Sequence, residues 1–276
     1  MRRGIRRATL IAAATVFASA CSTPPAPAPS NGNGSTVTPA ATSKNARPGT
    51  YDPETGTFTL MGAGGLPPNV FTYGGPNAIP LVGDWDGDGL DTVSIYVPSA
   101  GQFFLTNDNV AAPASTTFTF GAANMQPLVG DWDGDGRDTV GIYDAAHAGF
   151  FLTNKNAAEP AAITFVYGAP GMRALAGDWD GDGKDTVGVF DASTQTFFLT
   201  NTNGSEPAVA TFVFGAPNSL PLVGDWDGDG KDSVGAYDAD TGTYEERNAL
   251  SAGAPDVRVP FGAADLVPIT GVWKGK

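Results

Sequence analysis

The sequence has few of the residues on which nucleophilic catalysis and covalent cross-linking depend. Its 276 residues include one cysteine, Cys21, and one histidine, His147. A single cysteine cannot form an internal disulfide, and no serine or cysteine has a base partner that the sequence identifies. His147 occupies a turn position that Thr194 and Thr241 fill in later copies of a repeat described below, so we interpret it as a surface substitution. These absences disfavour an enzyme.

Basic residues and long apolar runs are also scarce. The chain has 15 lysines and arginines against 29 aspartates and glutamates, a formal net charge of −14, which disfavours a nucleic-acid partner because such binding depends on cationic side chains. The apolar run 8–17 is about half as long as the roughly 20 residues that a membrane-spanning helix needs. Because basic residues precede it and small residues 18–20 follow it, we predict a secretory signal over residues 1–20.

Cys21 stands where a bacterial lipoprotein signal places its acylated residue. Residues Ala18-Ser19-Ala20 before it resemble the lipobox of such signals, although alanine replaces the usual leucine. We therefore expect lipidation of Cys21; the alternative is an ordinary signal with an incidental cysteine. Residues 21–45 are rich in Pro, Ala, Ser and Asn and read as a disordered tether. The expected localisation is an exported protein, lipid-anchored in the bacterial cell envelope or at the cell surface.

The main feature that is present is a repeat. The string Gly-Asp-Trp-Asp-Gly-Asp-Gly begins at Gly83, Gly130, Gly177 and Gly224, with a spacing of 47 residues each time. Each copy is followed by three short runs rich in β-branched and aromatic residues, and no run shows helical periodicity. A fixed period with four strand-like runs per unit is typical of a propeller blade.

Counting the runs by type gives the number of blades. The run before the acidic loop occurs five times, near residues 79–85, 126–132, 173–179, 220–226 and 267–273. The N-terminal part of the repeat region supplies only the last three runs of a blade, and the C-terminal run supplies the missing first one. A ring closed in this way has no free end to cap. We predict an all-β, five-bladed β-propeller over residues 46–276 that is a monomer.

The acidic loops predict a metal site. Asp84, Asp86 and Asp88 occupy positions one, three and five, Gly89 allows the turn at position six, the carbonyl of Leu90 stands at position seven, and Asp91 stands at position eight. This order matches the first half of an EF-hand calcium loop. The alternative is a solvated Asp-Gly turn whose side chains cap backbone amides. The corresponding predicted ligands are Asp131, Asp133, Asp135, Arg137 and Asp138; Asp178, Asp180, Asp182, Lys184 and Asp185; and Asp225, Asp227, Asp229, Lys231 and Asp232.

We expect about four structural calcium ions, one for each loop, because extracellular modules bind calcium at about 10⁻⁴ to 10⁻³ M. The fifth equivalent corner, which follows Gly271, has no carboxylate and carries Lys274 at position three, so it cannot bind calcium.

The loops, together with Phe214-Gly215-Ala216-Pro217 and its near-copies at residues 120–123 and 167–170, resemble the FG-GAP repeat family. The resemblance covers the chain after the tether. It implies calcium-binding propeller blades like those of integrin α-subunits and many bacterial surface proteins. The family commonly places its fourth carboxylate at position nine, where this chain has Thr92 in the first loop, and its propellers usually have seven blades. The prediction of five blades therefore depends on the strand count.

Aromatic residues also recur with the repeat. All five tryptophans fall at one repeat position. They either pack between blades or form a ring of exposed platforms for sugars, and packing is favoured because Trp273 persists where the acidic loop is lost. The candidate ligand-binding residues in the second interpretation are Trp85, Trp132, Trp179 and Trp226. Of each adjacent pair Phe103-Phe104, Phe150-Phe151 and Phe197-Phe198, one member should be core, because successive strand residues face opposite sides.

The sequence thus favours a calcium-binding propeller at the cell envelope that presents an adhesion or recognition surface to a protein or carbohydrate ligand. Two alternatives remain: an enzyme acting on polysaccharide or cell-wall glycan, and a purely structural envelope protein. The ligand is not identified by any motif.

Overall fold

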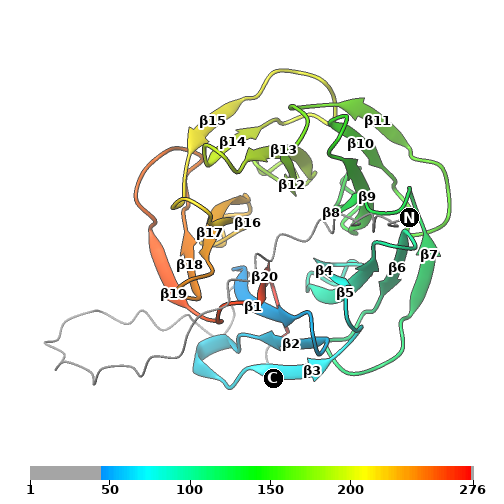
Figure 1. Ribbon diagram of the computed structural model, residues 1–276, viewed down its shortest axis with the longest axis vertical. Helices are drawn as coiled ribbons and strands as arrows, with labels where there is room; N and C mark the ends of the chain where they lie inside the picture. Colours follow the sequence, from blue (N-terminus) through cyan, green and yellow to red (C-terminus); the bar gives the residue numbers. More distant parts are fainter. Residues whose placement is uncertain (1–44, 275–276) are drawn as a thin grey trace, which may run out of the picture. The chain divides into compact units, whose positions relative to one another are not determined.

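The computed structural model describes residues 45–274. The predicted signal, Cys21 and nearly all of the tether lie outside the described residues. The twenty strands of the described part form five sheets of four antiparallel strands, arranged in a ring (Figure 1). The fold is therefore a five-bladed β-propeller, as the strand count predicted. No helix in residues 45–274 is long and apolar enough to cross a membrane.

The blades follow the order of the repeat, and each begins with the strand that precedes an acidic loop. Blade 1 comprises β20 (Val267–Gly271), β1 (Arg47–Asp52), β2 (Thr57–Leu60) and β3 (Asn69–Thr72). Blade 2 comprises β4 (Ile79–Gly83), β5 (Thr92–Val97), β6 (Gln102–Leu105) and β7 (Thr116–Thr119). Blade 3 comprises β8 (Gln126–Gly130), β9 (Thr139–Asp144), β10 (Gly149–Leu152) and β11 (Ile163–Val166). Blade 4 comprises β12 (Arg173–Gly177), β13 (Thr186–Asp191), β14 (Thr196–Leu199) and β15 (Ala210–Val213). Blade 5 comprises β16 (Leu220–Gly224), β17 (Ser233–Asp238), β18 (Thr243–Glu246) and β19 (Val257–Pro260).

The ring closes inside blade 1. Strand β20 pairs with β1 in a register that runs from Arg47 opposite Gly271 to Tyr51 opposite Val267. The C-terminal strand thus completes the N-terminal blade. The first strands of neighbouring blades contact one another and line the middle of the ring (Figure 1), so the acidic loops, which follow these strands, start close to the centre.

The core consists of aromatic ladders within blades and clusters between them. In blade 2, Tyr96, Phe103 and Phe118 lie on three adjacent strands with ring centroids 4.6 and 5.3 Å apart. Such pairs contribute about 0.5–1.5 kcal/mol each beyond their buried area. Phe103 is fully buried, whereas Phe104 faces the other side of the sheet and packs against the cluster between blades 1 and 2. One phenylalanine of each pair is therefore core, as the alternation predicted.

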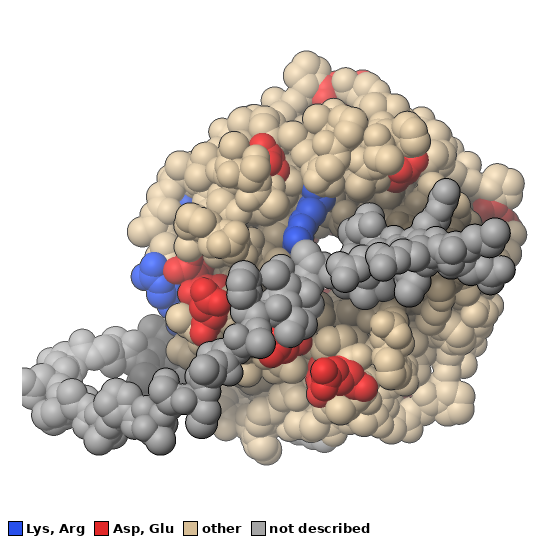
Figure 2. Space-filling view, in the orientation of Figure 1, with Lys and Arg blue, Asp and Glu red and all other residues tan. Residues whose placement is uncertain are grey.

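Acidic side chains do not form one continuous patch on the face that Figure 2 shows. They lie in separate groups spaced around the ring, and a basic side chain lies beside a central opening (Figure 2). On this face the negative charge is therefore divided among separate groups.

Candidate metal loops and the contacts between them

Each acidic loop is folded around its first aspartate. Asp84 accepts hydrogen bonds at Oδ1 from the amides of Gly87 and Asp88, at 2.7 and 3.1 Å, and at Oδ2 from the amide of Gly89, at 2.7 Å. Gly87 and Gly89 have φ values of +75° and +81°, a region that glycine adopts without the penalty of a Cβ atom. The glycines therefore let three amides converge on one carboxylate.

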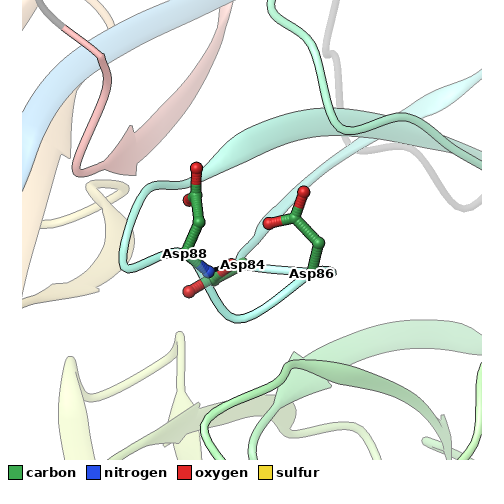
Figure 3. Close-up of side chains that lie close together, drawn as sticks. All are labelled: Asp84, Asp86 and Asp88. Atoms are coloured by element: carbon green, nitrogen blue, oxygen red, sulfur yellow. Dashed lines mark hydrogen bonds between the residues drawn. The ribbon is translucent and has the colours of Figure 1, made fainter.

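The aspartates at positions one, three and five come together in each of the four loops. One oxygen of each carboxylate lies within 4.8 Å of the others, and Figure 3 shows this group for Asp84, Asp86 and Asp88. In each group the first aspartate is half-buried and the third is exposed. The other three groups are Asp131, Asp133 and Asp135; Asp178, Asp180 and Asp182; and Asp225, Asp227 and Asp229.

Turn capping accounts for only part of this arrangement. Asp84 caps three amides and Asp88 accepts the amide of Leu90 at 2.9 Å, but within residues 45–274 no hydrogen bond reaches the carboxylate of Asp86 or Asp133. Three carboxylates so close together repel one another unless a cation lies between them. A set of hard oxygen donors suits calcium, which takes six to eight oxygens. The residues present therefore fit a divalent cation.

The position-seven residues remain in the loops beside these groups. Leu90 is partly exposed, and Arg137, Lys184 and Lys231 are exposed. The side chains of Arg137, Lys184 and Lys231 lie beside Gly87, Gly134 and Gly181 in the acidic loop of the preceding blade, so within their own loops only the backbone carbonyl remains as a candidate ligand.

The aspartate at position eight lies elsewhere. Asp138 begins the approach to β9, and its Oδ2 accepts the backbone amide of Asp84 in the preceding blade at 2.7 Å, while its own amide donates to the carbonyl of Asp84 at 2.8 Å. Its carboxylate is not part of the group formed by Asp131, Asp133 and Asp135. In this structure the carboxylate at position eight makes a contact between blades. We name the four residues at this position the latch aspartates: Asp91, Asp138, Asp185 and Asp232.

The same two hydrogen bonds recur around the ring. Asp185 binds the amide of Asp131 at 2.7 Å, Asp232 binds that of Asp178 at 3.0 Å, and Asp91 binds that of Val272 at 2.7 Å. At the fifth junction, between blades 5 and 1, the equivalent residue is Ala46. Its amide still donates to the carbonyl of Asp225 at 2.8 Å, but it has no carboxylate to offer in return.

Burial changes the acidity of the latch aspartates. It raises the pKa of Asp91 to about 6 and that of Asp232 to about 7, while the hydrogen bonds from Val272 and Asp178 oppose the rise. Burial, reinforced by the negative charge of Asp91, raises the pKa of Asp138 well above its usual range, and burial with the charge of Asp138 does the same for Asp185. The four latch aspartates are partly buried, and each carboxylate binds a backbone amide of the neighbouring blade.

Sequence reasoning missed an asparagine that supports three of the four latch aspartates. Asn109 accepts the amide of Val93 at 2.9 Å and donates to the carbonyl of Asp91 at 3.0 Å. Asn156 and Asn203 bind the carbonyls of Asp138 and Asp185 in the same way, at 2.9 Å. Their 47-residue spacing was visible in the sequence, but a polar residue in a turn has no signal of its own for a distant partner.

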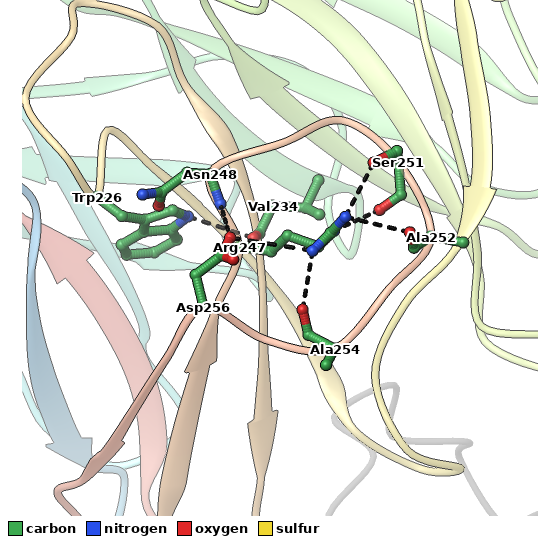
Figure 4. A network of polar contacts seen from close by, with 8 residues as sticks. All are labelled: Trp226, Val234, Arg247, Asn248, Ser251, Ala252, Ala254 and Asp256. Atoms are coloured by element: carbon green, nitrogen blue, oxygen red, sulfur yellow. Dashed lines mark hydrogen bonds and ion pairs between the residues drawn. The ribbon is translucent and has the colours of Figure 1, made fainter. Parts of the chain in front are cut away.

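Blade 5 departs from this pattern. Arg247 stands where Thr106, Thr153 and Thr200 stand in blades 2 to 4, and its guanidinium holds the loop between β18 and β19 together (Figure 4). It donates to the carbonyls of Ser251, Ala252 and Ala254 at 2.6, 3.1 and 2.8 Å.

The five tryptophans are buried. Their exposed fractions are 4–8%, and they belong to the clusters between blades. The indole of Trp226 donates to the carbonyl of Val234 at 3.2 Å (Figure 4). An exposed platform for sugars is therefore not formed at Trp85, Trp132, Trp179 or Trp226, because these side chains fill the space between strands.

Two grooves between blades recur with the repeat. One, of about 490 Å³, lies between blades 1 and 2 and includes Tyr73, Ile95 and Phe104 in its lining. The other, of about 330 Å³, lies between blades 2 and 3 and is lined by the residues one period later, Phe120, Ile142 and Phe151. The same positions thus form a groove at two successive boundaries.

His147 is exposed on the turn after β9. Its Nδ1 lies 2.6 Å from Oδ2 of Asp144, the last residue of that strand. This contact ties a turn together, as the sequence interpretation of His147 suggested.

Comparison with models of known protein families gave no match, and comparison with curated proteins gave none either.

Proposed function

We propose that this chain is a calcium-stabilised binding propeller of the FG-GAP type, exported and held at the bacterial envelope by a lipid on Cys21. The observation that carries the proposal is the fourfold recurrence of three converging carboxylates. Position three supports it best, because the carboxylates of Asp86 and Asp133 serve no capping role in the described part of the chain. A calcium ion bound in each loop would supply the partner that these carboxylates lack.

The role of calcium is structural in this proposal. An ion that binds the folded state alone adds about 1.4 kcal/mol for each site when its free concentration is about ten times the dissociation constant. Thermal unfolding of the full chain in millimolar calcium, in magnesium and in chelator tests this. We expect the highest midpoint in calcium, and an unchanged midpoint in chelator would overturn the proposal.

Binding is favoured over catalysis because the blades repeat one another. A catalytic centre needs unlike groups at one place, whereas the aspartate groups and the grooves recur with little change. His147, a candidate base by residue type, contacts Asp144 on an exposed turn.

The two equivalent grooves are the candidate ligand contacts. Equivalent sites at a fixed spacing suit a partner that presents the same group repeatedly, and weak contacts at several sites add up through effective concentration. A polysaccharide has this property. An acidic propeller with few cations is a poor surface for polyanions, so we propose a neutral or cationic glycan, with a protein ligand as the competing outcome.

The test is retention of the full chain on immobilised glycans, peptidoglycan and matrix proteins, with calcium and with chelator. Phe151→Ala, in the second groove, should weaken retention, whereas Phe150→Ala is unsuitable because that ring is core. A matched control is His147→Ala on an exposed turn. Release of soluble product from a glycan would favour the enzyme alternative, and neither retention nor release would favour a purely structural role.

The anchor is tested separately. Cys21→Ser should move the protein from the membrane fraction to the soluble fraction. The N-terminal peptide of the unaltered protein should carry the mass of a lipid, and that of the variant should lack it. Equal partition of both forms would contradict lipidation.

A further inference from the structure

The candidate calcium loops of adjacent blades are joined directly. The amide and the carbonyl of Asp84 bind the carboxylate and the amide of Asp138, at 2.7 and 2.8 Å. The loops also touch beyond these bonds: a Cβ atom added at Gly87 would lie 3.0 Å from the carbonyl oxygen of Gly136. There is therefore no solvent layer between one loop and the next at this point.

The latch acts on the residue that organises the neighbouring loop. Asp84 is held through its backbone by Asp138, and its side chain gathers the amides of Gly87, Asp88 and Gly89. A displacement of Asp84 would move the first carboxylate of the group and the turn that carries the other two. The position of one group thus depends on a residue that belongs to the next loop.

We infer that three of the latch aspartates, Asp138, Asp185 and Asp232, each position the calcium loop of the preceding blade, so that the four loops are coupled in a line from Asp84 through Asp131 and Asp178 to Asp225. This inference rests on the proposed calcium binding. The coupling is directional in its mutational effect, because loss of a latch should weaken the site of the preceding blade and spare the site of its own loop. It is reciprocal in its binding free energy, so calcium should bind adjacent loops with positive cooperativity.

The fifth junction supplies a natural comparison. Ala46 keeps the backbone bond to Asp225 and lacks the carboxylate, and the side chain of Asn45 donates to the carbonyl of Trp226 at 2.7 Å. The loop of Asp225 should therefore be the weakest of the four sites.

The experiment compares two substitutions in one loop. Asp138→Ala removes a latch and reproduces the arrangement at Ala46, whereas Asp133→Ala removes a position-three carboxylate of the same loop. Hydrogen exchange followed by mass spectrometry, on the full chain across a calcium titration, reports each loop separately through its flanking strands.

We expect Asp138→Ala to raise the calcium concentration that protects residues 83–91 by about tenfold or more, the usual effect of losing a hydrogen bond to a charged group. Protection of residues 130–136 should change much less. Asp133→Ala should show the opposite pattern. If Asp138→Ala instead weakens residues 130–136 and spares residues 83–91, position eight acts on its own loop and the inference is wrong.

A gain-of-function variant covers the case in which Asp138→Ala does not fold. Ala46→Asp installs the missing carboxylate at the fifth junction and should lower the calcium concentration that protects residues 224–231. No change in that concentration would overturn the inference. If the unaltered protein shows no calcium-dependent protection at any loop, the proposed calcium binding itself fails, which is a different result.

Discussion

At the scale of single residues, Glu246 is the clearest exception to the repeat. Leucine occupies this strand position in the other four blades, where Leu60, Leu105, Leu152 and Leu199 are 0–2% exposed. Glu246 is also buried, at 6% exposure, and burial raises its pKa from 4.5 to about 7. A carboxyl group in a leucine site costs stability once it ionises.

The expected consequence is a pH-dependent stability that Glu246→Leu removes. The unfolded chain releases this proton near pH 4.5 and the folded chain near pH 7, so the free energy of unfolding falls as pH rises between these values. The loss amounts to about 3 kcal/mol, since one pKa unit corresponds to about 1.4 kcal/mol. Urea unfolding between pH 4 and pH 8 measures it as the difference between the two proteins.

The matched control is Glu245→Gln. Glu245 is the preceding residue of the same strand and pairs with Arg258 at 2.9 Å on the opposite face. Its substitution should leave the pH dependence as it is. If the free energy of unfolding varies with pH in the same way in Glu246→Leu and in the unaltered protein, the pKa of Glu246 is not raised in the folded state and the prediction is wrong.

At the scale of elements, the acidic loop is the unit that the sequence described best. Its three carboxylates alternate within five residues, so short-range geometry alone brings them together. Asp138 was assigned to the same group because it is close in sequence. It follows the turn and leads into β9, and its partner Asp84 is 54 residues away. Distance along the chain gives no indication of a contact between blades.

The loop makes a direct prediction through Asp86→Ala. The substitution removes a carboxylate that has no capping role, so the calcium-dependent gain in unfolding free energy should fall by about 1.4 kcal/mol, the share of one site in tenfold excess of calcium. In chelator the variant should be at least as stable as the unaltered protein, because one repulsive charge is gone.

Asp108→Ala is the control for that measurement, because Asp108 is an exposed aspartate in the loop between β6 and β7. Its calcium-dependent gain should match that of the unaltered protein. An Asp86→Ala protein that keeps the full gain would mean that position three is not a ligand.

At the scale of the whole molecule, the acidic charge is a stability problem that solvent conditions should modulate. Of the 29 acidic residues, 12 lie in the four groups of three carboxylates. In chelator, added sodium chloride should raise the unfolding midpoint because it screens repulsion within each group over a Debye length of about 10 Å at 0.1 M. In saturating calcium the same salt should have a smaller effect. An equal salt dependence in both conditions would contradict neutralisation by bound ions.

The closure of the ring was predictable from strand counting, but the composition of its seam was not. The N-terminal residues are shifted by two positions relative to the 47-residue period. Counting along the sequence therefore does not align Ala46 with the latch aspartates, although it occupies the equivalent place in the structure. Within blade 5, Glu246 and Arg247 replace the usual leucine and threonine. Blade 5 and its junction with blade 1 thus carry the departures from symmetry.

The pairing of β20 with β1 should make ring opening costly, and a circular permutant tests this. Five residues separate Trp85 from Asp91, and Lys274, Gly275, Lys276, one added glycine and Asn45 would separate Trp273 from Ala46 by the same number. A chain joined in this way and opened between Ala122 and Ala123 has five contiguous blades and no strand shared between its ends.

The permutant should fold, because every strand pair is retained, but its ring should open more readily at the boundary of blades 2 and 3. Opening there breaks the side-chain contacts between blades 2 and 3 and the hydrogen bonds between Asp138 and Asp84. Opening of the unaltered ring also breaks the β20–β1 ladder of five residue pairs. Each hydrogen bond contributes about 0.5–1.5 kcal/mol, so native-state exchange of the Asp84 amide should accelerate by at least about tenfold. Unchanged exchange at this amide would show that packing between blades, and not the shared blade, keeps the ring closed.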